Sequence, residues 1–283
     1  MRMAKEPIRH MLSLDDNEYT GVILMKNYVI SLKTATDRRE HIINEFGKQN
    51  IKFEFFDAVT SININNICAQ LDLENLQQTN NLTNGEKGCF LSHVALWQKM
   101  LDDNLEWVAI FEDDVYLGQN AHLLLNSHDW LPEDIKLLKL EHFHSPLKLG
   151  HCIKTIQNRT IYPLYSANIG AAGYIIHQSV IKSLFDMLRH TKISHIKPLD
   201  HFLFEDTLDN HINIFQLSPA LCIQSSRLIV DNHLKSSIES ERSARMRQES
   251  NSRTFIEKIK REQSRLLQQI SKKLNKTQPV EFQ

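Results

Sequence analysis

Three consecutive carboxylates, Glu112, Asp113 and Asp114, are the residues of this chain with the clearest capacity for chemistry. They follow the apolar run 108–111, which predicts a buried parallel strand with the acids at its C-terminal edge. In open α/β sheets ligands bind at that edge. Adjacent carboxylates repel one another and raise one another's pKa. A divalent metal that also binds substrate phosphates would reduce this repulsion. The alternative is a solvated acidic turn after a strand.

The elements before the acids form a strand, a helix and a strand. Residues 21–32 predict a buried strand, and Asp37 is the expected cap of a helix that Gly47 ends. Residues 53–59 predict the next strand because they are rich in aromatic side chains and bounded by polar ones. This order is a βαβ unit.

The remaining elements continue the alternation. The Asn- and Gln-rich stretch 63–83 indicates a surface excursion, and a helix with one apolar side follows from Gly85 and leads back into the acidic strand. Further strands are expected at 137–140 and 170–176, and a helix at 179–189. The predicted fold class is α/β, with a mostly parallel sheet flanked by helices.

Composition narrows the class of protein. The chain has 283 residues, 41% of them hydrophobic, and a net charge of −1, which gives no indication of nucleic-acid binding. Its four cysteines are scattered without a metal-ligand spacing, which favours a reducing compartment. We see no signal peptide and no apolar stretch of about 18 residues, so we expect a cytoplasmic protein that does not span a membrane.

Charge changes near the C-terminus. Residues 239–276 contain eleven Lys or Arg and five Glu, a net of +6, on an interrupted apolar stripe. Such a segment can bind an anionic membrane surface, but a helix packed on the domain or a partly disordered tail is also consistent with it. We therefore divide the chain into an N-terminal extension (1–24), a main domain (25–238) and a basic amphipathic helical tail (239–283).

Motifs in the main domain resemble those of glycosyltransferase family 25, in the same order. They are YVISL at 28–32 with DRR at 37–39, FFDA at 55–58, GEKGCFLSH at 85–93, FEDDV at 111–115, GAAGYII at 170–176 and LSPALC at 217–222. The resemblance implies a GT-A-like nucleotide-sugar-binding fold, a UDP-sugar donor and inversion to a β-linkage. It implies a hexose, galactose or glucose with galactose preferred, transferred to a lipooligosaccharide or lipopolysaccharide core saccharide.

The acidic triplet looks like the D-x-D element of metal-dependent glycosyltransferases. The resemblance assigns Glu112 and Asp114 to a metal, manganese or alternatively magnesium, and also places Glu112 and Asp113 at the donor. Glutamate at the first position departs from the bare pattern and leaves open which carboxylate binds metal and which binds ribose. A metal would stabilise the charge that develops on the leaving diphosphate.

The same resemblance implies further donor-binding residues. Arg38 and Arg39 could pair with the diphosphate or cover the uracil, although either could also be a solvated helix residue. His93 could bind phosphate or sugar, or be a half-buried structural residue. The remaining donor-binding candidates are Ser31, Leu32, Ser92 and Gly173.

An inverting transfer needs a general base that takes the proton of the acceptor hydroxyl. Asp200 matches the Pro-x-Asp position of the family, and we choose it as the catalytic residue. Glu141, Glu205 and Asp206 are the competitors.

The expected partners are a UDP-sugar and a lipid-linked oligosaccharide, with peripheral contact at the cytoplasmic face of the inner membrane through the basic tail. Two other classes of protein use similar features. One is a non-catalytic nucleotide-sugar or carbohydrate-binding protein with this fold. The other is a phosphatase or nucleotidyltransferase that places two metals on the same carboxylates.

Overall fold

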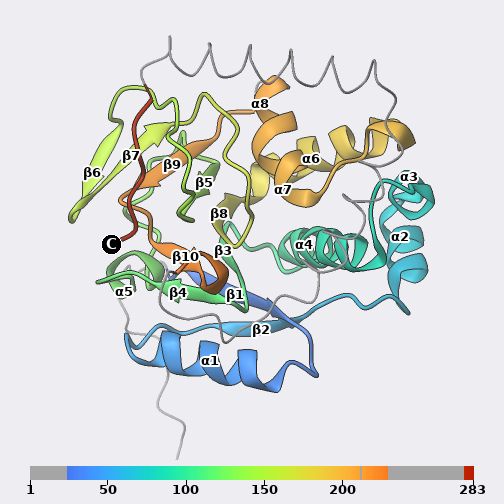
Figure 1. Ribbon diagram of the computed structural model, residues 1–283, viewed down its shortest axis with the longest axis horizontal. Helices are drawn as coiled ribbons and strands as arrows, with labels where there is room; N and C mark the ends of the chain where they lie inside the picture. Colours follow the sequence, from blue (N-terminus) through green and yellow to red (C-terminus); the bar gives the residue numbers. More distant parts are fainter. Residues whose placement is uncertain (1–23, 211, 229–276) are drawn as a thin grey trace, which may run out of the picture.

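A computed structural model describes residues 24–210, 212–228 and 277–283 (Figure 1). Its main sheet has eight strands in the spatial order β2-β1-β3-β8-β5-β9-β7-β6. The strands are β1 Lys26–Ser31, β2 Glu54–Asp57, β3 Trp107–Glu112, β5 Leu137–Lys139, β6 Lys154–Ile156, β7 Arg159–Pro163, β8 Gly173–His177 and β9 Phe215–Ser218. A second sheet pairs β4 (Val115–Leu117) with β10 (Cys222–Gln224).

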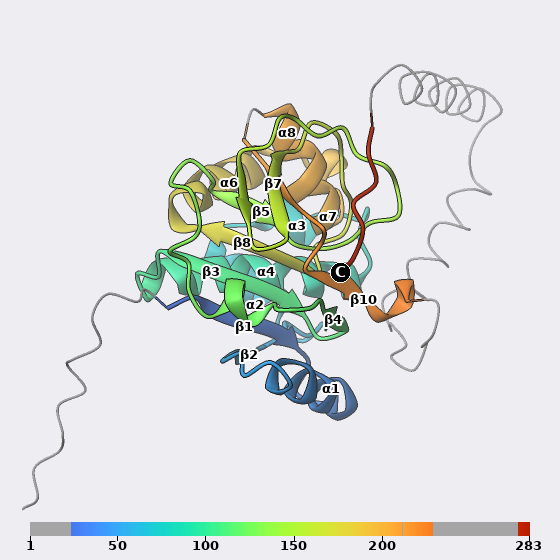
Figure 2. The same cartoon turned by 90° about the vertical axis from the view of Figure 1, so that its left-hand side faces the viewer.

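Helices lie on both faces of the main sheet (Figures 1 and 2). The α-helices are α1 Thr36–Gly47, α2 Ile64–Leu71, α3 Glu74–Gln78, α4 Asn84–Asp102, α5 His122–Leu125, α6 Gln178–His190, α7 Leu199–His201 and α8 Thr207–Asp209. A π-helix, Phe202–Asp206, joins α7 to α8, and 3₁₀ turns cover Ile193–His195 and Ser225–Arg227.

Strand direction decides which chain segments meet at the acidic edge. β1, β2 and β3 are parallel, β8 runs antiparallel between β3 and β5, and β5 is parallel to β9. Only β8 and β7 are reversed, so six of the eight strands point the same way. The predicted mostly parallel α/β sheet is confirmed. Because β8 is reversed, its first residue lies at the edge where β1, β3 and β5 end.

The apolar run of β3 is continuous because both faces of the strand are buried. Val108 and Ile110 belong to a core shared with α2, α4 and α6. Ala109 and Phe111 belong to the opposite core, which includes α1 and α5. Alternate side chains of a strand point to opposite faces, so a strand covered on both sides has no polar position until its end.

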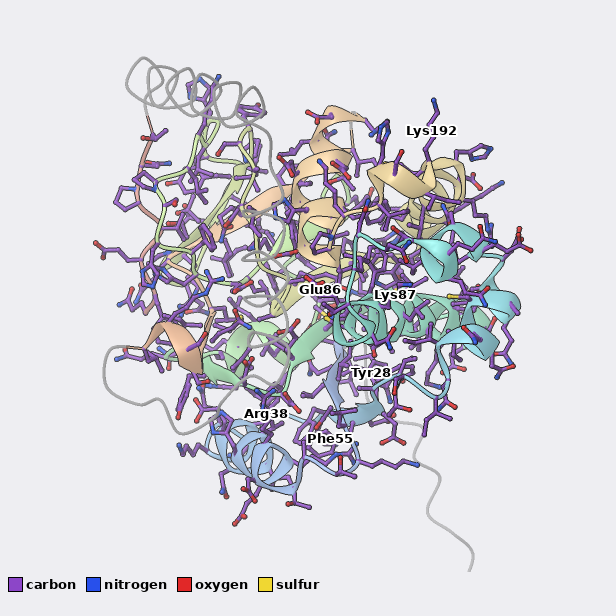
Figure 3. The ribbon with its side chains drawn as sticks, turned by 45° about the vertical axis from the view of Figure 1, so that its right-hand side comes forward. Tyr28, Arg38, Phe55, Glu86, Lys87 and Lys192 are labelled. Carbon is purple, nitrogen blue, oxygen red and sulfur yellow. The ribbon has the colours of Figure 1, made fainter. Side chains whose placement is uncertain are left out.

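The long helix α4 starts close to its predicted position, and a capping box fixes its first turn. Thr83 Oγ1 accepts a hydrogen bond from Glu86 N at 3.1 Å, and Glu86 Oε2 accepts one from Thr83 N at 2.9 Å. Glu86 and Lys87 are labelled on this turn in Figure 3. At α1 the predicted cap is off by two residues, because the N-cap is Ala35 and Asp37 lies in the first helical turn.

The segment 63–83 contains no strand, in agreement with its composition, but the expected surface excursion is wrong because the segment contains α2 and α3. Ile64, Cys68 and Leu71 of α2, and Leu76 of α3, are buried in the core that includes α4. Polar Asn and Gln fill the positions between these apolar residues. The high content of Asn and Gln therefore made the helical spacing of the few apolar residues difficult to recognise in the sequence.

Residues 277–283, the end of the predicted helical tail, are extended and lie on the main domain. Gln278 forms an antiparallel bridge with Leu147, Phe282 forms a parallel bridge with Ala220, and Val280 is 1% exposed. The predicted extension, apart from Leu24, and the basic stretch 239–276 lie outside the described residues. Among the helices that are described, none has the length and apolarity needed to cross a bilayer.

Candidate functional site

The sheet brings four chain segments together around the acidic triplet. Glu112 is the last residue of β3, and Ser31 is the last residue of the parallel strand β1. Gly173, the first residue of β8, pairs with Phe111. Glu141 follows β5 on the other side of β8. Polar side chains therefore do come together at the edge of the sheet where β1 and β3 end, as the sequence predicts.

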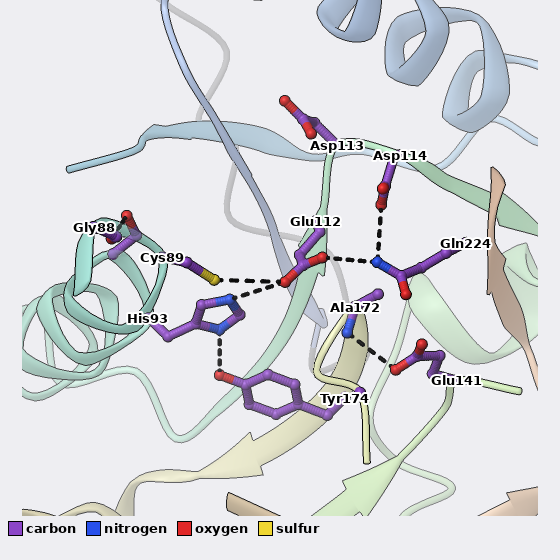
Figure 4. Close-up of polar contacts among 12 residues, drawn as sticks. Gly88, Cys89, His93, Glu112, Asp113, Asp114, Glu141, Ala172, Tyr174 and Gln224 are labelled. Carbon is purple, nitrogen blue, oxygen red and sulfur yellow. Dashed lines mark hydrogen bonds and ion pairs between the residues drawn. The ribbon is translucent and has the colours of Figure 1, made fainter. Parts of the chain in front are cut away.

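Asp113 points away from its two acidic neighbours (Figure 4). Its carboxylate accepts hydrogen bonds from Ser31 Oγ at 2.7 Å and from Arg38 Nη1 at 2.5 Å. Arg38 Nη2 also lies 3.9 Å from Asp114 Oδ2. Arg38 comes from α1, directly beyond the end of β1 (Figure 3), so the turn after β1 places a cation over the triplet.

Glu112 and Asp114 point toward a shared amide. Gln224 Nε2 donates to Glu112 Oε2 at 3.1 Å and to Asp114 Oδ1 at 3.4 Å. The antiparallel pairing of β10 with β4 sets Gln224 beside Val115, and Ser225 N donates to the Asp114 carbonyl at 2.8 Å. The small second sheet thus brings residues from more than a hundred positions later to the triplet.

Burial makes ionisation of these carboxylates costly. Burial, and after it the charges of Glu141, Asp113 and Asp200, together raise the pKa of Glu112 to about 7. Burial also raises the pKa of Asp114 to about 7, with Glu112 as the next contribution and Arg38 opposing both. Burial and mutual repulsion therefore both disfavour the ionised forms of Glu112 and Asp114.

This donor set fits a hard divalent metal. Carboxylate oxygens of Glu112 and Asp114 converge on one side of the triplet, and the Asp114 side chain is only 6% exposed. Oxygen ligands suit Mg²⁺ and Mn²⁺, and a dication would lower both raised pKa values. The solvated acidic turn is excluded, because Asp113 and Asp114 are buried and hydrogen-bonded.

Arg39 has a different environment from Arg38. Its Nη2 donates to Asp57 Oδ1 at 2.6 Å and to the Ser31 carbonyl, while Nε donates to the carbonyl of Leu32. The guanidinium lies 4.7 Å from the centre of the Phe55 ring. Arg39 thereby fixes the turn after β1, and Leu32 in that turn is 36% exposed.

Ser92 and His93 lie inside the protein on α4. The Ser92 hydroxyl accepts from Val59 N at 2.8 Å and donates to the Gly88 carbonyl at 2.6 Å. His93 is fully buried, which lowers its pKa to about 3 and keeps the ring neutral. Its Nε2 lies 3.8 Å from Glu112 Oε1. His93 therefore contacts the triplet from inside the protein, through Glu112. Ser92 does not contact the triplet in these hydrogen bonds but connects α4 to the loop after β2.

The glycines at the start of β8 are needed for packing. A Cβ on Gly173 would come within 2.2 Å of Cys222 Sγ. Gly170 has a φ of +115°, and a Cβ there would lie 2.6 Å from Glu141 Oε2. These glycines let the loop before β8 approach the acidic edge closely.

The candidates for the general base differ in their exposure to solvent. Asp200 is partly exposed in α7, and its charge contributes to the raised pKa of Glu112. Glu141 is fully buried, and its Oε2 accepts from Ala172 N at 3.1 Å and lies 3.5 Å from Lys139 Nζ. Arg227 lies 3.9 Å from Glu141 Oε1. Glu205 is bonded to His201 at 2.8 Å and Lys197 at 3.3 Å.

Sequence reasoning missed Gln224, Arg227 and Cys89 as members of this site. Gln224 and Arg227 belong to a short strand and a single turn without a recognisable pattern. Cys89 precedes His93 by four residues, and this i, i+4 spacing on a helix was a signal that could have been used.

Comparison with known proteins identifies the class. Residues 24–203 match the model of Glycosyltransferase family 25 (LPS biosynthesis protein). The chain is 40% identical over 226 residues to the lipooligosaccharide biosynthesis protein lic2B of Haemophilus influenzae, covering 76% of this chain and 82% of that protein. It is 34% identical over 286 residues to lex-1 of the same organism, covering 90% and 94%.

A third relative is the lacto-N-neotetraose biosynthesis glycosyltransferase LgtE of Neisseria gonorrhoeae, 36% identical over 208 residues, with 71% of this chain and 74% of that protein covered. Among solved structures, a glycosyltransferase involved in glycosylation of the PBCV-1 major capsid aligns with a TM-score of 0.41 at 10% identity, covering 79% and 99%. The family match and the relatives define a glycosyltransferase. The chain belongs to glycosyltransferase family 25, the family of LPS biosynthesis proteins.

Proposed function

We propose that this glycosyltransferase is an inverting enzyme that moves galactose from UDP-galactose to a lipooligosaccharide core saccharide, forming a β-linkage. The observation that supports it best is the pair Glu112 and Asp114. Within a family 25 chain, the partly exposed carboxylate of Glu112 and the buried one of Asp114, both with raised pKa values, lie at the strand edge where a nucleotide sugar would bind. UDP-glucose is the alternative donor.

The proposed roles follow from position. Glu112 and Asp114 would hold Mn²⁺, or alternatively Mg²⁺, which when bound supplies positive charge at the leaving diphosphate. Ser31 and Arg38 hold Asp113 in place through hydrogen bonds, and Asp113 would face the nucleotide. Arg39 shapes the turn whose exposed Leu32 would contact the donor. Three further residues would support the donor pocket from inside the protein, because all three are buried: Ser92, His93 and Gly173.

Asp200 is the proposed general base. The acceptor hydroxyl oxygen forms a bond to the anomeric carbon while the bond from that carbon to the diphosphate oxygen breaks, and the hydroxyl proton passes to Asp200. Asp200 is partly exposed, as a base that meets an incoming acceptor must be. Glu141 is less suited, because burial, Lys139 and the Ala172 amide hold it inside the protein.

The test is UDP release from UDP-galactose and UDP-glucose, with and without Mn²⁺, in the intact chain and in Asp114→Ala. We expect metal-dependent release that the substitution abolishes, and faster release from UDP-galactose. Turnover of neither donor with a lipooligosaccharide acceptor present, together with retained UDP binding, would favour the non-catalytic binding protein. Release of inorganic phosphate would instead favour a phosphatase.

We also propose that the acceptor is lipid-linked and that the basic stretch 239–276 binds the cytoplasmic face of the inner membrane. The support is its net charge of +6 and apolar stripe. Truncation after Glu239 would also remove residues 277–283, which pack on the domain. A cleaner variant replaces Lys and Arg of the stretch by Gln. Sedimentation with phosphatidylglycerol vesicles should fall, and unchanged sedimentation would refute this anchor.

A further inference from the structure

Cys89, His93 and Glu112 form a cluster whose three ligand atoms, a thiol sulfur, an imidazole nitrogen and a carboxylate oxygen, all lie within 4.8 Å of one another. Cys89 Sγ lies 3.8 Å from Glu112 Oε1, and His93 Nε2 lies 3.8 Å from the same oxygen (Figure 4). Cys89 and His93 are four residues apart on α4, so they share one face of the helix.

His93 supplies the observation that points to a ligand. Its Nε2 is buried and has no hydrogen-bond partner among the described residues. Its other nitrogen, Nδ1, contacts the Tyr174 hydroxyl at 2.9 Å, and that hydroxyl also accepts from Trp97 Nε1 at 2.9 Å. The ring is therefore held in one orientation with Nε2 directed at Glu112. A buried nitrogen without a partner is costly. A metal at Nε2 requires the tautomer in which Nδ1 carries the proton and donates it to the Tyr174 hydroxyl, and metal-binding histidines commonly donate from their other ring nitrogen in this way.

We propose that Cys89, His93 and Glu112 form a binding site for a thiophilic divalent cation of the Zn²⁺ type, distinct from the oxygen-ligand site of Glu112 and Asp114. Thiolate and imidazole ligands favour Zn²⁺ over Mg²⁺ and Mn²⁺. On binding, the Cys89 thiol releases its proton to solvent and the sulfur forms a bond to the metal.

The spacing fits such an ion after a small adjustment. Bond lengths of about 2.0–2.3 Å place neighbouring ligands of a tetrahedral Zn²⁺ about 3.3–3.5 Å apart. The two contacts of Glu112 Oε1 must each shorten from 3.8 Å, which rotation of the Cys89 and Glu112 side chains can provide. Glu112 belongs to both metal sites and therefore couples them. Its Oε1 faces the Cys89 thiol, and its Oε2 accepts from Gln224 beside Asp114.

Co²⁺ is the metal for the test, because a thiolate bound to it gives a charge-transfer absorption in the near ultraviolet that oxygen and nitrogen ligands do not. Titration of the metal-free chain should produce this absorption, and excess Zn²⁺ should remove it. Cys89→Ser should abolish it, and His93→Gln should weaken Co²⁺ binding about tenfold or more. Cys152→Ser, at an exposed cysteine, and Asp114→Asn should both retain it.

Absence of the charge-transfer band in the intact protein would overturn the proposal, as would a band that persists in Cys89→Ser. Circular dichroism confirms that each variant is folded, and Cys89→Ala replaces the serine variant if that one is not. None of these measurements uses a sugar donor. Failure of the metal site is therefore distinguishable from failure of the proposed transferase activity.

Discussion

Asp114→Asn should stabilise the metal-free protein at pH 8, although it removes a charged residue from the proposed active site. In the folded chain the pKa of Asp114 rises from its ordinary value of 3.8 to about 7. A difference of about 3 in pKa corresponds to about 4 kcal/mol of unfavourable ionisation. That pKa already includes the attraction of Arg38, but part of the shift comes from the charge of Glu112, whose ionisation is coupled to that of Asp114. We therefore expect the substitution to recover about half of this energy, a gain of about 2 kcal/mol in the free energy of unfolding.

The gain should depend on pH with a definite sign. Between about pH 4 and 7 the folded state binds more protons than the unfolded state, so the stability of the unmodified chain decreases as pH rises through this range. The advantage of Asp114→Asn should therefore shrink from about 2 kcal/mol at pH 8 to below about 1 kcal/mol at pH 5. Urea unfolding in the presence of a chelator measures both values.

Two comparisons sharpen this experiment. Asp129→Asn changes an exposed aspartate and should alter stability by less than about 0.5 kcal/mol at either pH. Mn²⁺ should stabilise the unmodified chain, by about 2.7 kcal/mol at one hundred times its dissociation constant, and much less in Asp114→Asn. If Asp114→Asn is less stable than the unmodified chain at pH 8 without metal, Arg38 and Gln224 fully compensate the carboxylate and the argument for a metal from electrostatics is refuted.

Three further substitutions test other parts of the structure. Asp200→Asn should lower kcat by about 10²–10⁴-fold with little change in UDP affinity, measured by UDP release and by calorimetry; an unchanged kcat would exclude Asp200 as the base. Lys139→Met should cost about 3–5 kcal/mol in urea unfolding, because it leaves buried Glu141 without its nearest cation; a neutral result would show that the contact between Lys139 and Glu141 does not stabilise the fold. Thr83→Ala should cost about 1 kcal/mol by removing the cap of α4, and Thr60→Ala, at an exposed threonine, should cost less than about 0.5 kcal/mol.

The sequence predicted elements whose side-chain pattern is local and strong. The apolar run of β3, the period of α4 and the glycines before β8 each follow from backbone geometry and burial on one or two faces. The motifs from residue 28 to residue 222 were enough to predict the family, and the family match confirms it. The pattern failed at 63–83, where polar residues between buried apolar ones concealed α2 and α3.

The contents of the site depended on tertiary structure. Gln224 reaches Glu112 and Asp114 only because β10 pairs with β4, and no local signal specifies that pairing. Reversal of β8 is likewise a property of the whole sheet, and it brings the loop before β8 to the ends of β1, β3 and β5. The sequence determined which residues carry charge and which are apolar. Only the fold decided which carboxylates share a buried space, because desolvation and charge repulsion depend on distances between residues far apart in the chain.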